Sequence, residues 1–264
     1  MPEPSTHYPH PVLFLIIVIY LVIGTLYAFL TPPWQIPDEP AHYNYVRFAA
    51  ENLSYPVLQM GDYPHQYLED IKARHFPPEM SIDPIRYEFH QPPLYYSLAV
   101  PFYWVTRFWP PAQQVIALRF LALLMGGGII YLAYLIAREV FPTNEVLALG
   151  TAAFVAGVPM HLAMLAAVNN DGLAELMLAG ILWMLIRYVK EGGEGKEGAE
   201  RRISWRLAGL GVLVGLGVLT KTTTLVSIPL ILVAVVLALG HRPSAIGHRP
   251  SAISYSLSSS RRSS

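Results

Sequence analysis

Two clusters of acidic and imidazole side chains mark the ends of one polar stretch. Pro37-Asp38-Glu39-Pro40-Ala41-His42 opens the stretch, and Tyr87-Glu88-Phe89-His90-Gln91-Pro92-Pro93 closes it. Carboxylates and imidazoles together can act as a general base beside a phosphate leaving group, or bind a divalent cation. The candidates for catalysis are Asp38, Glu39 and Glu88, those for substrate binding are His42 and His90, and those for a metal are Asp38, Glu88 and His90. For Asp38 and Glu39 a solvated turn is the alternative, because Pro-Asp-Glu-Pro is a favourable turn sequence.

A third acid and two cations extend this set. Asp171 follows two asparagines at the start of an apolar segment, where helix capping is an alternative role. Lys221 lies between two apolar segments, and Arg119 lies near the start of another. Both are candidate contacts for a substrate phosphate, and a lysine that extends to the membrane interface is the alternative for Lys221. Asp171 is therefore a catalytic candidate, and Lys221 and Arg119 are substrate-binding candidates.

The composition indicates a membrane protein. Of the 264 residues, 53% are hydrophobic and only 14% are charged, which is too apolar for an ordinary soluble domain. The formal net charge is zero and gives no indication of a nucleic-acid partner. The chain contains no cysteine, so disulfides, thiolate nucleophiles and cysteine-ligated metals are excluded.

The apolar residues occur in blocks of membrane-spanning length. Residues 11–30 predict a retained transmembrane helix rather than a cleaved signal peptide, because no positive charge precedes the block and no small-residue cleavage site follows it. The prolines of segment 31–93 exclude one long helix and favour short helices at 41–52 and 67–74. Further spans are expected at about 115–137, 146–167, 172–189, 206–219 and 224–239. The predicted fold class is an all-α transmembrane bundle of about six spans with a long extracytoplasmic first loop.

One segment decides how the spans are oriented. Residues 94–109 are short and rich in Tyr and Trp, which favours a helix in the membrane interface over a span. The basic connection 187–206 is expected on the cytoplasmic side. Counting back from it places residues 31–113, 169–171 and Lys221 together on the outer side.

The end of the sequence has a different character. Residues 192–198 are glycine-rich and predict a flexible linker. Gly240-His241-Arg242-Pro243-Ser244-Ala245-Ile246 repeats once without an apolar face, and a serine-rich stretch follows it. Residues 240–264 are therefore expected to be a disordered or aberrant tail, and the chain is expected to be the N-terminal part of a larger membrane protein.

The order of the motifs resembles the GT-C superfamily of integral-membrane glycosyltransferases. The resemblance rests on the first span with its Asp-Glu loop, on Glu-x-His-Gln-Pro-Pro-Leu-Tyr-Tyr, on Leu118-Arg119-Phe120, on Asp171, and on Gly215-Leu216-Gly217-Val218-Leu219-Thr220-Lys221. Within that superfamily, the chain is similar to the protein O-mannosyltransferases and aminoarabinose transferases. The resemblance implies a GT-C-like domain over residues 1–239.

The resemblance implies inverting transfer of a sugar from a polyprenyl-phosphate donor. Asp38 or Glu39 would then be the base for an acceptor hydroxyl on a protein, lipid or glycan, and Glu88 and Asp171 would be further acids of the site. Lys221 and Arg119 would meet the donor phosphate. The site would face the extracytoplasmic side of the plasma (inner) membrane, and dependence on a divalent metal stays open.

Two other functions compete with this one. A transporter or a flippase for lipid-linked glycans would use ionisable residues inside the spans, and Glu175 and His161 are the candidates. Against it, the other acids are predicted at one surface, and the sequence has no inverted repeat. A non-catalytic subunit of a membrane assembly is the third possibility.

Overall fold

The computed structural model describes residues 10–192 and 199–240, and all regular elements within these ranges are helical. In chain order they are α1 (Pro11–Leu30), α2 (Glu39–Asn52), α3 (His65–Ala73), η1 (Tyr87–His90), α4 (Leu94–Thr106), α5 (Pro111–Val140), α6 (Glu145–Gly157), α7 (Pro159–Leu165), α8 (Asp171–Gly192), α9 (Ala199–Val218), η2 (Thr222–Val226) and α10 (Ser227–Gly240). The all-α fold class is confirmed. The predicted tail lies outside the described residues except for Gly240, as do residues 193–198 of the predicted linker.

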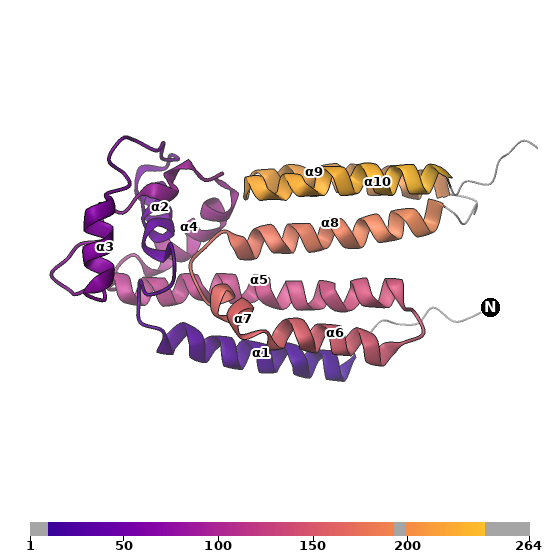
Figure 1. Ribbon diagram of the computed structural model, residues 1–264, viewed down its shortest axis with the longest axis horizontal. Coiled ribbons are helices and arrows are strands. Elements are labelled where there is room, and N and C mark those ends of the chain that lie inside the picture. The colour runs from indigo at the N-terminus through magenta and orange to yellow at the C-terminus, as the bar shows by residue number, and fades with distance from the viewer. Residues whose placement is uncertain (1–9, 193–198, 241–264) are drawn as a thin grey trace, which may run out of the picture.

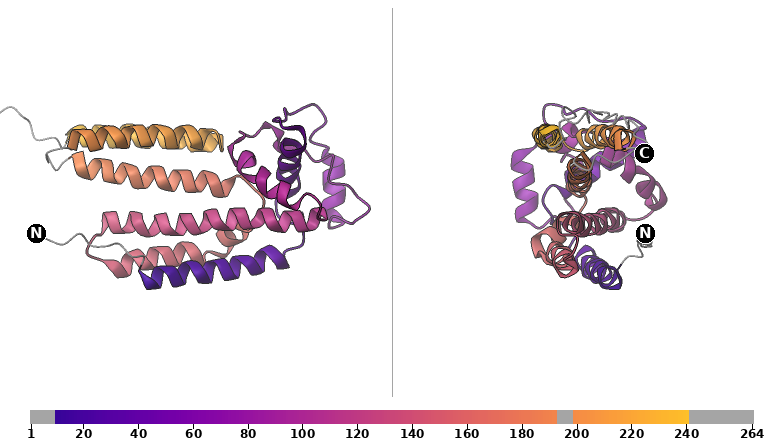
Figure 2. Two further views of the ribbon diagram at one scale, coloured as in Figure 1. Left: turned by 180° about the vertical axis from the view of Figure 1, so that it is seen from behind. Right: turned by 90° about the vertical axis from the view of Figure 1, so that its right-hand side faces the viewer.

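The long helices form a bundle with an added layer at one end (Figure 1). Helix α5 is central and packs against α1, α6 and α8, while α8 packs in turn against α9 and α10. Helices α2, α3 and α4 gather beyond the end of the bundle, where α1 ends and α5 and α8 begin (Figures 1 and 2). We call residues 31–110 the cap, and the end of the bundle that carries it the cap end.

Three helices are long and apolar enough to cross a membrane: Pro11–Leu30, Pro111–Val140 and Asp171–Lys190. At 30 residues, α5 is roughly 45 Å long, which exceeds a hydrocarbon core of about 30 Å. It therefore extends into the cap, as Figure 1 shows. The apolar stretches Trp205–Val218 and Thr222–Leu237 are shorter, and the predicted count of six spans is not confirmed.

The span predicted at 146–167 is broken. Helices α6 and α7 meet at an angle of 65°, and together they could form one bent span, which would make four. The break falls between Gly157 and Pro159. Proline lacks a backbone N–H and disfavours helical geometry in the residue before it, so Val158 is extended, with φ −73° and ψ 110°.

Aromatic residues form the core of the cap. The rings of Tyr45 and Tyr96 stack with their centroids 3.5 Å apart, which joins α2 to α4, and Phe89 of η1 packs edge-on against Tyr45. The short helices predicted at 41–52 and 67–74 are present as α2 and α3, and each begins two residues earlier. Helix α4 has only 13 residues and packs on α2 and α5 within the cap.

The cap is fastened to the connections that return from the bundle. The backbone N–H of Leu94 donates to the carbonyl oxygen of Leu219 over 2.9 Å. The side-chain amide of Asn170 donates to Thr220 O and to Gln91 Oε1, each over 3.1 Å. Three distant parts of the sequence, near residues 91–94, 170 and 220, therefore meet at the cap end.

Candidate functional site

Glu39 and Arg119 form a fully buried ion pair beneath the cap. Arg119 Nε donates to Glu39 Oε1 over 2.8 Å and Nη2 donates to Oε2 over 2.6 Å, while both side chains are 0% exposed. Arg119 also donates to the carbonyl oxygens of Ala28, Thr31 and Pro32. A buried pair is stable only when its remaining hydrogen-bonding groups are satisfied, and these bonds supply that.

The carboxylate of Glu39 is equally occupied. It accepts from the backbone N–H groups of Trp34 at 2.9 Å and Val168 at 3.2 Å. The pair thus ties the end of α1, the start of α2, α5 and the connection before α8 together. In this geometry neither side chain is open to a substrate, which differs from the catalytic role predicted for Glu39 and the phosphate contact predicted for Arg119.

Asp38 precedes Glu39 and has the opposite surroundings. Its side chain is exposed, and its Oδ1 accepts a hydrogen bond from the Tyr87 hydroxyl over 2.7 Å. Its backbone is left-handed, with φ 64°, and its side chain makes no capping bond to α2. Non-glycine residues adopt this conformation at a cost of about 1–3 kcal/mol and concentrate at functional sites. The side chain of Asp38 therefore contacts η1 rather than its own helix.

Glu88 of η1 lies close enough to Asp38 to interact with it electrostatically. It is 9% exposed, and its Oε2 accepts from Gln91 Nε2 over 2.8 Å. Burial is the main cause that raises the pKa of Glu88; Asp38 raises it further, while Gln91, His90 and Lys221 act in the opposite direction. The structure therefore brings together these predicted residues from both ends of the polar stretch, with a lysine from far along the chain.

The two predicted histidines differ. His42 is buried, and its Nδ1 is hydrogen bonded to the Tyr96 hydroxyl at 2.8 Å. Burial lowers the pKa of His42 to about 3, so its imidazole is neutral at physiological pH. His90 is exposed, and its Nδ1–H donates to the carbonyl oxygen of Tyr87 over 2.7 Å, which leaves Nε2 free to face solvent or a ligand.

Asp171 and Lys221 join the site from the bundle. Lys221 Nζ donates to Asp171 Oδ1 over 2.5 Å, and the two side chains are 22% and 50% exposed respectively. Capping of α8 comes instead from Asn169, whose Oδ1 accepts from the backbone N–H groups of Asp171 and Gly172. Asp171 therefore does not cap α8, and its carboxylate accepts the hydrogen bond from Lys221.

Sequence reasoning missed the residues that support this site. Tyr87 contacts Asp38, Gln91 links Glu88 to Asn170, and Tyr96 supports His42. Tyr87 and Gln91 belong to the same Tyr-Glu-Phe-His-Gln motif as Glu88. Their closeness to Glu88 in the sequence could have identified them as site residues. Asn170 directly precedes the candidate Asp171, but its hydrogen-bond partners lie 79 and 50 residues away and could not be read from the sequence.

A second ionisable pair lies deeper in the bundle. His161 Nε2 is 2.9 Å from Glu175 Oε2, and the pair joins α7 to α8. Glu175 is one helical turn from Asp171 and lines a cavity of about 330 Å³ between the helices. Within the described part of the chain, no three or more His, Asp or Glu side chains are grouped closely enough to hold a metal ion.

Comparisons with known proteins give one match. A family model described as dolichyl-phosphate-mannose-protein mannosyltransferase matches residues 104–251, which is more than half of the 264 residues. The matched range contains Arg119, Asp171 and Lys221, whereas Asp38 and Glu88 precede it. Searches of curated proteins and of solved structures found no significant match.

Proposed function

The chain belongs to the dolichyl-phosphate-mannose-protein mannosyltransferase family of GT-C membrane glycosyltransferases, and from that premise we propose that Asp38 is the base of its transfer reaction. The family uses a sugar linked to a polyprenyl phosphate. The proposed reaction moves that sugar, with mannose the first candidate, to a hydroxyl group of an acceptor. The proposed site is formed by Asp38, Glu88, His90, Asp171 and Lys221.

The observation that carries this proposal is the contrast between two neighbouring carboxylates. Glu39 is fully buried and bonded to Arg119, whereas Asp38 is exposed and its carboxylate accepts a hydrogen bond from Tyr87. A general base must reach the proton that it removes, so accessibility favours Asp38. Glu39 and Arg119 are then positioning residues, because they fix the backbone on which Asp38 is carried.

The proposed chemistry has one bond-forming and one bond-breaking event. Asp38 accepts the proton of the acceptor hydroxyl as its oxygen attacks the anomeric carbon of the donor sugar. The bond from that carbon to the phosphate oxygen breaks, and polyprenyl phosphate leaves with the electron pair. Attack opposite the leaving group inverts the anomeric configuration.

Lys221 is the proposed partner of the leaving phosphate. Its ammonium group is bonded to Asp171, the first residue of α8, and this end of α8 lies at the cap end (Figure 1), where the headgroup of a membrane-embedded donor would lie. A fixed cation near the developing charge stabilises the transition state. His90, with its exposed ring, and Glu88, which lies close to Asp38, are the proposed contacts to sugar hydroxyls. Neutral His42 supports this surface through Tyr96.

The proposed orientation places the cap on the extracytoplasmic side of the plasma membrane. The basic residues of the 187–206 connection support it, since cytoplasmic loops are enriched in Lys and Arg. The ends of α8 that carry Asp171 and Lys190 lie at opposite ends of the bundle. The site would then take its donor from the outer leaflet.

The deciding experiment replaces Asp38 by an isosteric amide. Asp38→Asn should lower the rate of mannose transfer from a polyprenyl-phosphate mannose to a Ser/Thr-containing peptide by about 100-fold or more, because a general base contributes about 10²–10⁴. Asp70→Asn, at an exposed carboxylate of α3, is the matched control and should keep the parent rate.

Measuring donor binding and thermal stability distinguishes a loss of the catalytic base from a loss of folded structure in this variant. Asp38→Asn should retain binding of the polyprenyl-phosphate donor and the melting temperature of the parent chain in detergent. Undiminished transfer by Asp38→Asn, with the parent chain active, would remove Asp38 from the role of base.

A further inference from the structure

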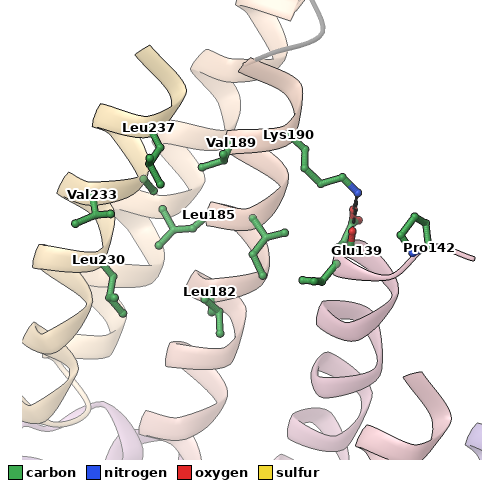
Figure 3. Close-up of a pocket in the computed structure, with 12 residues that line it drawn as sticks. Glu139, Pro142, Leu182, Leu185, Val189, Lys190, Leu230, Val233 and Leu237 are labelled. Atoms are coloured by element: carbon green, nitrogen blue, oxygen red, sulfur yellow. Dashed lines mark hydrogen bonds and ion pairs between the residues drawn. The ribbon is translucent and has the colours of Figure 1, made fainter. Parts of the chain in front are cut away.

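An apolar groove runs along α8 towards the end of the bundle opposite the cap (Figure 3). Its volume is about 580 Å³, within the range of small-molecule sites. Helices α5 and α10 both pack on α8, and the groove lies between them. Its apolar lining comes mainly from α8 and α10: Leu182, Leu185, Val189, Leu230, Val233 and Leu237.

Charged residues close one end of the groove. Lys190 extends from α8 towards the end of α5, where its Nζ donates to Glu139 O over 2.7 Å and lies 3.3 Å from Glu139 Oε2 (Figure 3). Arg187 Nε lies 3.3 Å from the other oxygen of the same carboxylate. Arg187 and Lys190 therefore share one carboxylate. Both cations remain partly exposed, at 45% for Lys190 and 37% for Arg187.

The depth of these cations matches a membrane surface. Lys190 follows Asp171 by 19 residues of one helix, a rise of about 29 Å, and the hydrocarbon core is about 30 Å thick. A lipid whose phosphate lies at Lys221 cannot also place that phosphate at Lys190. With the cap at one membrane surface, Lys190 of the groove and the neighbouring Arg187 lie at the depth of the headgroups of the opposite leaflet.

We propose that this groove binds one anionic phospholipid of that leaflet. An acyl chain lies between α5 and α10 on the leucines and valines of the groove, and Lys190 and Arg187 contact the phosphate. Basic pockets between transmembrane helices are a recurrent site for anionic headgroups. The site is separate from sugar transfer, and binding alone tests it.

The first test fills the groove. The full chain, purified in mild detergent, is incubated with palmitoyl-oleoyl phosphatidylglycerol or phosphatidylcholine, and bound lipid is counted by native mass spectrometry. One phosphatidylglycerol should stay bound in preference to phosphatidylcholine. Val233→Trp should abolish this binding, because Val233 lines the groove and is 58% exposed, so a larger side chain enters the cavity. Val236→Trp, on the same helix but outside the groove, should retain it.

The second test removes one charge. Lys190→Gln should weaken phosphatidylglycerol binding about fivefold, the contribution of one basic residue at an anionic surface. Lys72→Gln, at an exposed lysine of α3, should leave it unchanged. Equal retention of both lipids, with no effect of Val233→Trp or Lys190→Gln, would mean only annular lipid and overturn the proposal. A dimer that Val233→Trp dissociates, or displacement of phosphatidylglycerol by polyprenyl phosphate alone, would overturn it in favour of another occupant.

Discussion

Asp38 and Glu39 are adjacent and chemically alike, and they have opposite surroundings. Both carboxylate oxygens of Glu39 accept hydrogen bonds from Arg119, so Glu39 is not open to a substrate. The same ion pair fixes the backbone at the start of α2, from which the Asp38 side chain contacts Tyr87. The sequence identified both carboxylates as candidates but could not separate them. The residue that decides, Arg119, lies 80 positions away and was expected to bind phosphate.

The buried pair predicts a large loss of stability on removal of one partner. Arg119→Met should lower the free energy of unfolding by about 3–5 kcal/mol, since Glu39 would remain buried without a counter-charge. Thermal unfolding in detergent measures this. Arg74→Met breaks an exposed ion pair with Asp70 and should cost less than about 1 kcal/mol. Equal losses in the two variants would contradict the structural role of the pair.

His42 predicts a specific pH dependence. Its folded-state pKa of about 3 lies below the ordinary value near 6.5; burial is the main cause, Lys221 and His90 add to it, and Asp38 opposes it. Because the unfolded chain binds the proton more readily, the folded state loses stability as the pH falls below about 6.5 towards 3. At pH 5 the loss amounts to about 2 kcal/mol.

The variant His42→Gln tests this dependence, because glutamine can keep a hydrogen bond to Tyr96 but does not titrate. Its melting temperature relative to the parent chain should rise as the pH is lowered from 7 to 5. A constant difference between the two proteins over this range would show that His42 does not titrate on unfolding.

At the scale of helices, length and hydrophobicity predicted most of the bundle. The blocks 11–30, 115–137 and 172–189 lie within α1, α5 and α8, because twenty apolar residues leave few alternatives to a helix in a membrane. The break before Pro159 was not predicted, although proline was its visible cause. What the sequence could not predict was how closely the helices approach one another, which depends on single glycines.

Neighbouring glycines of α5 provide a matched test of that packing. A Cβ at Gly126 would overlap the hydroxyl of Tyr20 on α1, whereas a Cβ at Gly127 would have Ile17 as its nearest neighbour at 3.8 Å. Gly126→Ala should lower the free energy of unfolding by about 1–3 kcal/mol through overpacking. Gly127→Ala should raise it by up to about 1 kcal/mol, the helix propensity gained. Thermal unfolding of both variants checks the contact, and an equal response would contradict it.

At the scale of the whole molecule, the cap brings distant segments to one end of the bundle. Leu94 bonds to Leu219, and Asn170 bonds to Gln91 and Thr220. The expectation that residues 94–109 do not cross the bundle agrees with this arrangement, because α4 lies within the cap (Figure 2). Charge and hydrophobicity predicted that these segments lie on the same side of the membrane. Which residues contact one another depends on long-range hydrogen bonds, which the sequence does not reveal.

Labelling predicts which connections share a side of the membrane. Because the chain has no cysteine, single cysteines can replace exposed Ser54 of the cap, Thr223 of η2 and Thr143 of the α5–α6 turn. An impermeant thiol reagent added to intact cells should label the first two and spare the third until the cells are opened. Labelling of Ser54→Cys and Thr223→Cys from opposite sides would contradict one shared site.

The 80 residues between Glu39 and Arg119 also have a consequence for the time course of synthesis. At about 5–20 residues per second, Glu39 emerges roughly 4–16 s before its counter-charge is made. During that interval the carboxylate of Glu39 has no arginine to pair with. Lys221 is made later still, so the first apolar helix of this end is made first and the lysine of the proposed site is made last. Assembly of this end of the protein is therefore complete only after Lys221 has been made.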